Sequence, residues 1–227
     1  MTAQAVAHRG DPYHFRENTL PSVRSALSKG ADVVEVDVRL TRDGVPVLLH
    51  DPTLERLWGH PTEVGALTAA EVAQLTGGGV PTLAAALEEL RAHTTGRLLL
   101  DLTEPEQVGT VLAAVRDAGA ADRVYYCGEL TAMFEVRAHQ PAAEVAMTWK
   151  TTARPPAGLL AELAPRWLNY RFPLADRATV AWTHDHGFLA AAWTADWGRS
   201  MSRLLAAGVD AITTNRLDAL RRLLPRD

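Results

Sequence analysis

Short apolar runs alternate with longer amphipathic stretches along most of the chain. The short runs are strand-like, whereas the longer stretches repeat apolar residues every three or four positions, which is typical of helices. In residues 19–30, for example, Leu20, Val23, Ala26 and Leu27 share one helical face, and Gly30 marks the end. The pattern predicts eight strands, at residues 4–8, 32–40, 97–102, 123–127, 144–149, 167–172, 189–193 and 211–214. It predicts eight helices following them, at residues 19–30, 82–93, 104–119, 130–139, 157–164, 176–187, 197–207 and 216–224.

This strict alternation predicts a parallel sheet with helices outside it. Eight strand–helix units favour closure into a (β/α)8 TIM barrel, for which about 250 residues is typical. The chain has 227 residues, so we expect compact loops and a single domain over residues 1–227. A doubly wound open sheet is the alternative, but it calls for a glycine-rich phosphate loop after the first strand. The segment HRGDPYHFREN at residues 8–18 holds one glycine, which favours the barrel.

One segment interrupts the alternation directly after the second strand. Residues 45–51 follow residues 32–40 with no room for a helix, and Asp43-Gly44 is a strong hairpin turn signal. A two-residue loop there would place His50 opposite Asp37, with Cβ atoms about 5 Å apart. A loop one residue longer would shift this register. We expect residues 52–80 to form a small excursion on the same rim, with a short helix near residues 68–75.

Composition limits the kinds of partner that we expect the protein to bind. The chain is 47% hydrophobic and carries a net charge of -4, which argues against nucleic acid and anionic membrane surfaces as partners. No stretch approaches the roughly 18 apolar residues of a membrane-spanning helix. Cys127 is the single cysteine, so an internal disulfide is excluded, and residues 1–10 lack the features of a signal peptide. We expect a cytoplasmic protein with a small-molecule substrate, and the oligomeric state stays open.

Acidic residues occupy the late positions of two predicted strands. Glu35 and Asp37 are two residues apart, so both face the same side of the strand at residues 32–40. Asp101 is late in the next barrel strand, with Thr103 on the same side. In a (β/α)8 barrel these strand ends form the functional face. Three carboxylates there predict a divalent cation site for Ca²⁺ or Mg²⁺ rather than Zn²⁺.

Two histidines and an arginine complete the pattern. His8 ends the first strand and Arg9 follows it, while His50 ends the predicted hairpin. A divalent cation flanked by these groups suits phosphate ester chemistry. The histidines would act as general base and general acid, and Arg9 would neutralise charge on phosphoryl oxygens.

Several residues at these strand ends also have a structural alternative. Asp101 could cap the helix that begins near Pro105, and Arg9 could pair with Glu17. Trp193 could be an ordinary core residue.

The chain resembles the glycerophosphodiester phosphodiesterase family over nearly its whole length. The segments that carry the resemblance are HRG, ENTLPSVRSAL, GADVVEVDVRLTRDGVPVLLHDPTLER, VPTLAAALEEL and AAWTADWGRSMSRLLAAGVDAITTNRLDAL. The resemblance implies a (β/α)8 barrel that hydrolyses glycerophosphodiesters to glycerol 3-phosphate and an alcohol, through a cyclic phosphate. It implies that His8 and His50 are the acid–base pair and that Glu35 and Asp37 hold the metal. It also implies that Arg9 grips the phosphate and that Trp193 lies near the substrate.

The sequence departs from the family pattern on its third and its last two strands. A common Glu-x-Lys reads Asp101-Leu102-Thr103 here. Asp keeps an oxygen ligand, as in the related sphingomyelinase D proteins, whereas Thr103 removes a cation, for which Lys150 is a candidate replacement. The family's TVN reads TAD, ending in Asp196, and its TD-x-P reads TNRL, with Asn215 in place of Asp.

These departures leave two alternatives to the hypothesis of a metal-dependent hydrolase. One is a phospholipase D-like lyase that releases a cyclic phosphate from lysophospholipids and has an apolar rim. The other is a barrel that binds a phosphorylated ligand without turnover, which the loss of the lysine at Thr103 motivates. The presence of His8 and His50 argues against the last, because a pure binder needs no acid–base pair.

Overall fold

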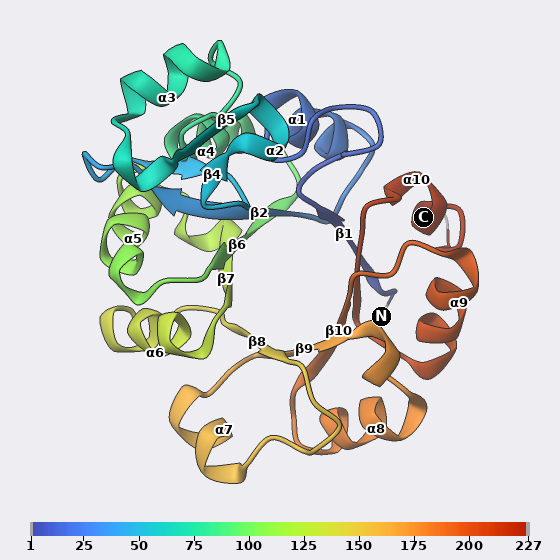
Figure 1. The fold of residues 1–227 in the computed structure, drawn as a ribbon. Coiled ribbons are helices and arrows are strands. Elements are labelled where there is room, and N and C mark those ends of the chain that lie inside the picture. The colour runs from blue at the N-terminus through green and yellow to red at the C-terminus, as the bar shows by residue number, and fades with distance from the viewer. Residues whose placement is uncertain (1, 226–227) are drawn as a thin grey trace.

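Eight parallel strands form a ring in the computed structural model, which describes residues 2–225 (Figure 1). The strand order around the ring is β7-β6-β2-β1-β11-β10-β9-β8, as the (β/α)8 prediction requires. The strands are β1 (Gln4–His8), β2 (Val33–Leu40), β6 (Arg97–Leu102), β7 (Val124–Gly128), β8 (Ala146–Trp149), β9 (Trp167–Arg171), β10 (Leu189–Trp193) and β11 (Ala211–Thr214). The predicted fold class is confirmed.

Helices surround the ring on its outside (Figure 1). They are α1 (Leu20–Ser28), α4 (Leu83–Arg91), α5 (Val108–Asp117), α6 (Leu130–His139), α7 (Ala157–Leu163), α8 (Arg177–Asp185), α9 (Gly198–Ala207) and α10 (Leu217–Arg221). Short 3-10 turns η2 (Pro105–Gln107), η3 (Ala121–Arg123) and η4 (Phe172–Leu174) join some of them to the strands. Local capping explains several starts, since the Thr19 and Thr82 side chains each accept a hydrogen bond from a backbone N–H of the first turn. No helix between residues 2 and 225 has the length and apolar character needed to cross a membrane.

The core has two layers because side chains alternate along each strand. On β6, Leu98, Leu100 and Leu102 pack outward against the helices. Leu99 packs inward, in a cluster that fills the ring. That inner cluster consists of Val6, Val33, Leu99, Tyr125, Cys127, Ala146, Trp167, Ala191 and Ala211. Residues two positions further along β2 and β6 therefore also point inward, above this apolar floor.

The ring is paired unevenly. Strands β2 and β6 pair over six consecutive residue pairs, from Val33↔Arg97 to Val38↔Leu102. Between β7 and β8 the pairing is a single bridge, Tyr126↔Val145, with the Tyr126 N–H donating to the Glu144 carbonyl at 3.1 Å. This β7–β8 seam is the weakest join of the barrel.

The predicted hairpin and excursion follow β2. The hairpin strand is β3 (Pro46–Leu48). The excursion contains β4 (Thr53–Leu54), α2 (Glu55–Trp58), β5 (His60–Glu63), η1 (Val64–Ala66) and α3 (Ala69–Thr76). It has its own small core, made of Val47, Leu49, Leu54, Val64, Val72 and Val80. We call residues 41–80 the rim module.

The predicted hairpin register is wrong by one residue. Val38 lies opposite Leu48, and the Leu49 N–H donates to the Asp37 carbonyl, so His50 is not opposite Asp37. The turn is longer than the assumed two residues because the Thr41 N–H donates to the Val45 carbonyl, which leaves three residues in the loop. The last of them, Gly44, has a φ of 77°, as expected of a three-residue hairpin loop.

Candidate active site

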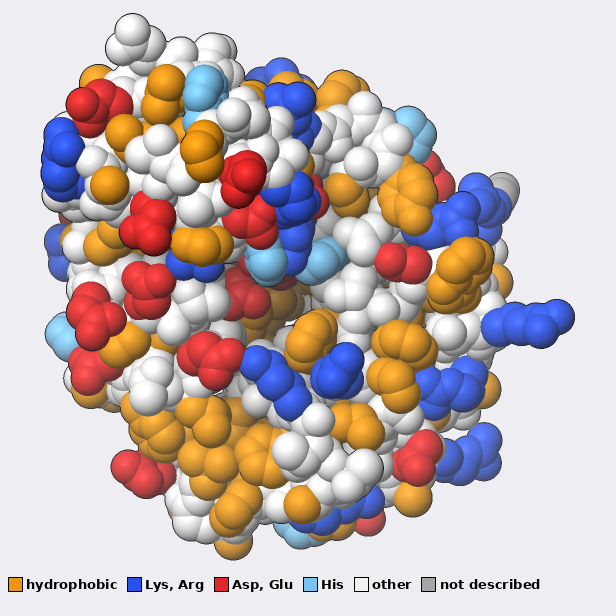
Figure 2. Space-filling view, in the orientation of Figure 1, with side chains coloured by type: hydrophobic (Ala, Val, Ile, Leu, Met, Phe, Trp, Pro, Cys, Tyr) orange, Lys and Arg blue, Asp and Glu red, His pale blue; other side chains and the backbone are white. Residues whose placement is uncertain are grey.

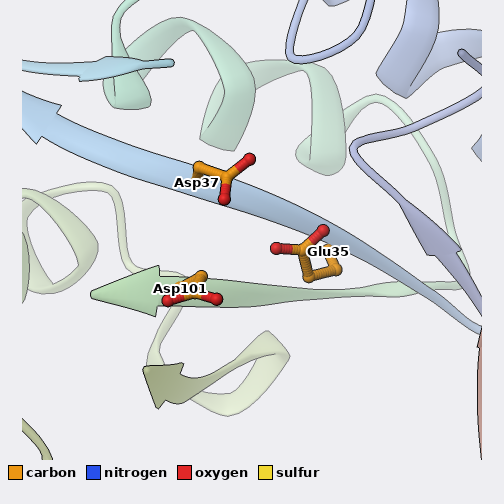
Figure 3. Close-up of side chains that lie close together, drawn as sticks. All are labelled: Glu35, Asp37 and Asp101. Atoms are coloured by element: carbon orange, nitrogen blue, oxygen red, sulfur yellow. The ribbon is translucent and has the colours of Figure 1, made fainter. Parts of the chain in front are cut away.

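Three carboxyl groups meet at the C-terminal ends of β2 and β6 (Figure 3). The β2–β6 register pairs Asp37 directly with Asp101, and Glu35 lies one inward position earlier on β2. One oxygen from each group lies within 4.8 Å of the others. Glu35 and Asp37 are buried, with 4% and 8% of their surface exposed.

This arrangement disfavours the ionised forms of Glu35 and Asp101. Burial, and then the charges of Asp37 and Asp101, raise the pKa of Glu35 well above its ordinary value. Burial and the charge of Asp37 raise the pKa of Asp101 to about 6. The Asp101 Oδ1 atom is buried and has no hydrogen-bond partner among the described residues. An unpaired buried oxygen beside two more carboxylates fits a divalent cation that prefers oxygen ligands, such as Ca²⁺ or Mg²⁺.

Arg9 contacts the carboxylates through both backbone and side chain. Its backbone has a φ of 57°, and its N–H donates to Glu35 Oε2 at 3.0 Å. The next residue, Gly10, has a φ of 88°, and a Cβ there would lie 2.4 Å from Ser22 Oγ. The Arg9 guanidinium lies 3.0 Å from Asp37 and donates to Glu17 at 2.8 Å. The structural interpretation of Arg9 as a partner of Glu17 is confirmed, and Arg9 also lines the cavity.

The two histidines are 42 positions apart in the sequence, and both line the same cavity. The Nδ1 atom of His8 lies 2.8 Å from Asn215 Oδ1, and its Nε2 atom lies 3.9 Å from Glu35 Oε2. Burial is the largest of the influences that lower the pKa of His8. The His50 side chain is 47% exposed, and its Nδ1 atom lies 2.6 Å from Asp51 Oδ1.

A line of ion pairs joins His50 to Arg9. Asp51 also accepts from Arg56, and Arg56 donates to Glu17 Oε1 at 2.7 Å. Glu17 in turn accepts from Arg9. The first strand–helix loop and the rim module are thus held together across the mouth.

The cavity enclosed by these groups has a volume of about 250 Å³. Figure 2 shows the hollow near the centre of the ring, with acidic, basic, histidine and hydrophobic side chains around it. All eight site residues expected from the sequence line it, namely His8, Arg9, Glu35, Asp37, His50, Asp101, Lys150 and Trp193.

The surroundings of Lys150, Trp193 and Asp101 bear on three questions that the sequence left open. Lys150 lines the cavity and is paired with Glu129 at 2.7 Å. Trp193 is partly exposed rather than buried in the core. Asp101 lies within β6 and does not cap η2, whose N-cap residue is Glu104.

Several supporting residues were not predicted from the sequence. Asp51, Arg56, Asp196 and Asn215 hold the predicted histidines or their partners. The adjacency of Asp51 to His50 was a usable signal. Asn169 was also missed: it lines the cavity from β9, and its buried Oδ1 atom has no hydrogen-bond partner among the described residues.

The fold and the acidic cluster define a (β/α)8 barrel with a cation-compatible site at its C-terminal face. A family model of the glycerophosphoryl diester phosphodiesterase family matches residues 8–219. The chain therefore belongs to this family, which confirms the predicted resemblance and the predicted class of enzyme.

Relatives match the chain along its length. It is 24% identical over 243 residues to the glycerophosphodiester phosphodiesterase of Caldanaerobacter subterraneus, covering 99% of this chain and 98% of that protein. An Oleispira antarctica phosphodiesterase, solved with the product sn-glycerol-3-phosphate, has a TM-score of 0.86 and 23% identity, with 97% and 96% coverage. A Thermotoga maritima glycerophosphodiester phosphodiesterase has a TM-score of 0.84 and 20% identity, with 97% and 98% coverage. The structural similarities show the shared fold.

Proposed function

We propose that the protein hydrolyses glycerophosphodiesters to glycerol 3-phosphate and an alcohol, with a divalent cation. The observation that carries this proposal is the convergence of three carboxylates, two histidines and Arg9 on one cavity of about 250 Å³. The product bound to the Oleispira antarctica relative supports the same substrate class.

In this proposal Glu35, Asp37 and Asp101 hold the cation, which is Ca²⁺ or Mg²⁺. When bound, the cation supplies charge neutralisation at the phosphoryl oxygens. Arg9 adds a second positive charge beside the same carboxylates. Lys150 reaches the cavity wall and supplies the cation that Thr103 lacks, and Trp193 forms an apolar wall for the glycerol.

The two histidines carry the protons of two successive displacements. In the first, the substrate's 2-hydroxyl oxygen forms a bond to phosphorus and the bond from phosphorus to the alcohol breaks. One histidine accepts the hydroxyl proton and the other donates a proton to the departing alcohol. In the second, water opens the cyclic phosphate and the proton movements reverse, which gives glycerol 3-phosphate.

The test is release of glycerol 3-phosphate from glycerophosphocholine and glycerophosphoethanolamine, with Ca²⁺, Mg²⁺ or EDTA. We expect release with one of the cations and loss of release in EDTA. We expect His50→Ala to lower kcat by about 10²–10⁴-fold, as is typical when an acid–base group is removed. His139→Ala, on the exposed face of α6, is the matched control and should leave the rate unchanged.

Other outcomes separate the other hypotheses. No release from folded protein with either cation would overturn the substrate assignment. Accumulation of a cyclic phosphate from lysophospholipids, followed by ³¹P NMR, would identify the lyase. Saturable binding of glycerol 3-phosphate with no turnover of any of these substrates would identify the binding barrel.

A further inference from the structure

Asp196 holds Asn215 at two points beside the mouth of the barrel. Its Oδ1 atom accepts from the Asn215 backbone N–H at 2.8 Å, and its Oδ2 atom accepts from the Asn215 side-chain Nδ2 at 2.8 Å. The Thr214 hydroxyl donates to the same carboxylate at 3.1 Å. Asp196 follows β10 and Asn215 follows β11, so two neighbouring strand ends form the contact.

This contact determines which way the Asn215 amide faces. An ionised carboxylate only accepts hydrogen bonds, so the NH₂ group of Asn215 must face Asp196. The amide oxygen is therefore directed at His8 Nδ1, which is 2.8 Å away. That oxygen can only accept, so the hydrogen of this bond belongs to His8 Nδ1.

The position of this hydrogen fixes the other ring nitrogen. In neutral imidazole one nitrogen carries the hydrogen and the other carries a free lone pair. The lone pair of His8 is consequently on Nε2, the atom on the side of Glu35 and the carboxylate cluster. The 3.9 Å from Nε2 to Glu35 Oε2 is too long for a hydrogen bond, which leaves Nε2 free to act on a substrate.

We propose that Asp196 and Asn215 are positioning residues that hold His8 in the tautomer whose Nε2 accepts a proton in the cavity. This inference rests on the proposed function for its catalytic consequence only. The tautomer itself follows from the hydrogen bonds.

The two residues also account for two departures of this chain from the family pattern. Where the family has Asn and then Asp, the chain has Asp196 and then Asn215. The carboxylate and the amide have therefore exchanged places relative to the family pattern. The two side chains contact each other in this chain. Exchanging the two residues gives a variant in which a carboxylate at position 215 can accept from His8 Nδ1.

The tautomer is measured directly by long-range ¹H–¹⁵N correlation of the His8 ring in the full-length protein, at pH 8 with MgCl₂. We expect the wild-type signals of an Nδ1–H, Nε2-unprotonated ring. Asn215→Leu removes the acceptor, so the signals should move toward a mixture of tautomers. The double exchange Asp196→Asn with Asn215→Asp should return them to the wild-type pattern.

Activity gives the second readout. For Asn215→Leu we expect kcat to fall by about 10–100-fold, the usual cost of losing an orienting partner, with KM within about twofold. The double exchange should recover kcat to within about threefold of wild type. Asp117→Asn, on the exposed end of α5, is the control and should change neither readout.

A wild-type His8 ring protonated on Nε2, or unchanged ring signals in Asn215→Leu, would overturn the proposal. So would a double exchange that keeps the mixed tautomers. Because the NMR measurement needs no substrate, failure of the proposed activity and failure of this inference give different results.

Discussion

At the scale of single residues, Asp101 destabilises the folded protein when its buried carboxyl group is ionised. It pairs in register with Asp37 and leaves Oδ1 buried without a partner. Burial and the neighbouring charge raise its pKa to about 6, which is above the value of about 3.9 for an unfolded chain. The folded protein therefore favours protonated Asp101, and its contribution to stability is present below pH 4 and is lost as the pH rises through 6.

We predict that Asp101→Asn stabilises the metal-free protein at pH 8 by about 1–3 kcal/mol, because it removes this buried charge. At pH 5 the gain should fall to about half. Thermal unfolding in EDTA measures the difference, with Asp122→Asn as an exposed control. Adding Ca²⁺ or Mg²⁺ should raise the Tm of wild type more than that of the variant. A variant that is less stable than wild type at pH 8 in EDTA would contradict the argument.

The three carboxylates of the cavity could be predicted from the sequence because strand period and strand ends determine where they lie. A strand's period of two puts Glu35 and Asp37 on one face, and strand ends in a barrel share one rim. Most of the residues that hold the site in place could not be predicted. Arg56 reaches Glu17 across 39 positions, and His8 reaches Asn215 across 207. Such contacts depend on loop conformations that hydrophobic periodicity does not encode.

At the scale of elements, the rim module supplies half of the proposed acid–base pair. His50 comes from the segment after β3, and the module packs around its own core of six buried residues. The ion pairs from Asp51 through Arg56 to Glu17 tie this module to the first strand–helix loop. The position of His50 relative to Arg9 thus depends on these side chains as well as on the backbone pairing of β3 with β2.

We predict that Arg56→Met lowers kcat by about tenfold while changing KM little, because Asp51 loses the group that holds it against His50. Steady-state release of glycerol 3-phosphate measures the effect. Arg42→Met is the matched control: Arg42 also lies in the rim module, but it contacts Ala66 and Glu71. Equal losses in the two variants would show that the effect comes from general loosening of the module.

The elements themselves were predicted more reliably than their register. Each expected strand and barrel helix is present, with ends that differ by a few residues. The hairpin after β2 was the exception, because Asp43-Gly44 suits both a two-residue and a three-residue loop. One additional loop residue moved His50 out of its expected pairing with Asp37. The short β4–β5 hairpin and α2 were also not predicted, since two-residue and four-residue elements carry little periodicity.

At the scale of the whole molecule, the extent of strand pairing differs around the barrel. Six residue pairs join β2 to β6, whereas a single bridge joins β7 to β8. The carboxylate cluster lies on the well-paired side. The strand alternation predicts closure but gives no indication of where the ring is weakest.

We predict that the Tyr126 amide, which donates across the β7–β8 seam, has a lower free energy of opening for hydrogen exchange than the β6 amides have. The difference in opening free energy should be at least about 1.4 kcal/mol, or tenfold in protection. Native-state hydrogen exchange measures both sets in one experiment. Equal protection would mean that the ring opens only as a unit.

The hydrogen bond from His8 to Asn215 joins the first strand to the loop after the last one. During synthesis a growing chain contains all three carboxylates once residue 101 has been added. The partner that orients His8 is made 114 residues later, at position 215. A ribosome-bound intermediate can therefore carry the acidic cluster long before it can carry an oriented His8. If His8 acts as proposed, its ring can be oriented only after residue 215 has left the ribosome and packed against β1.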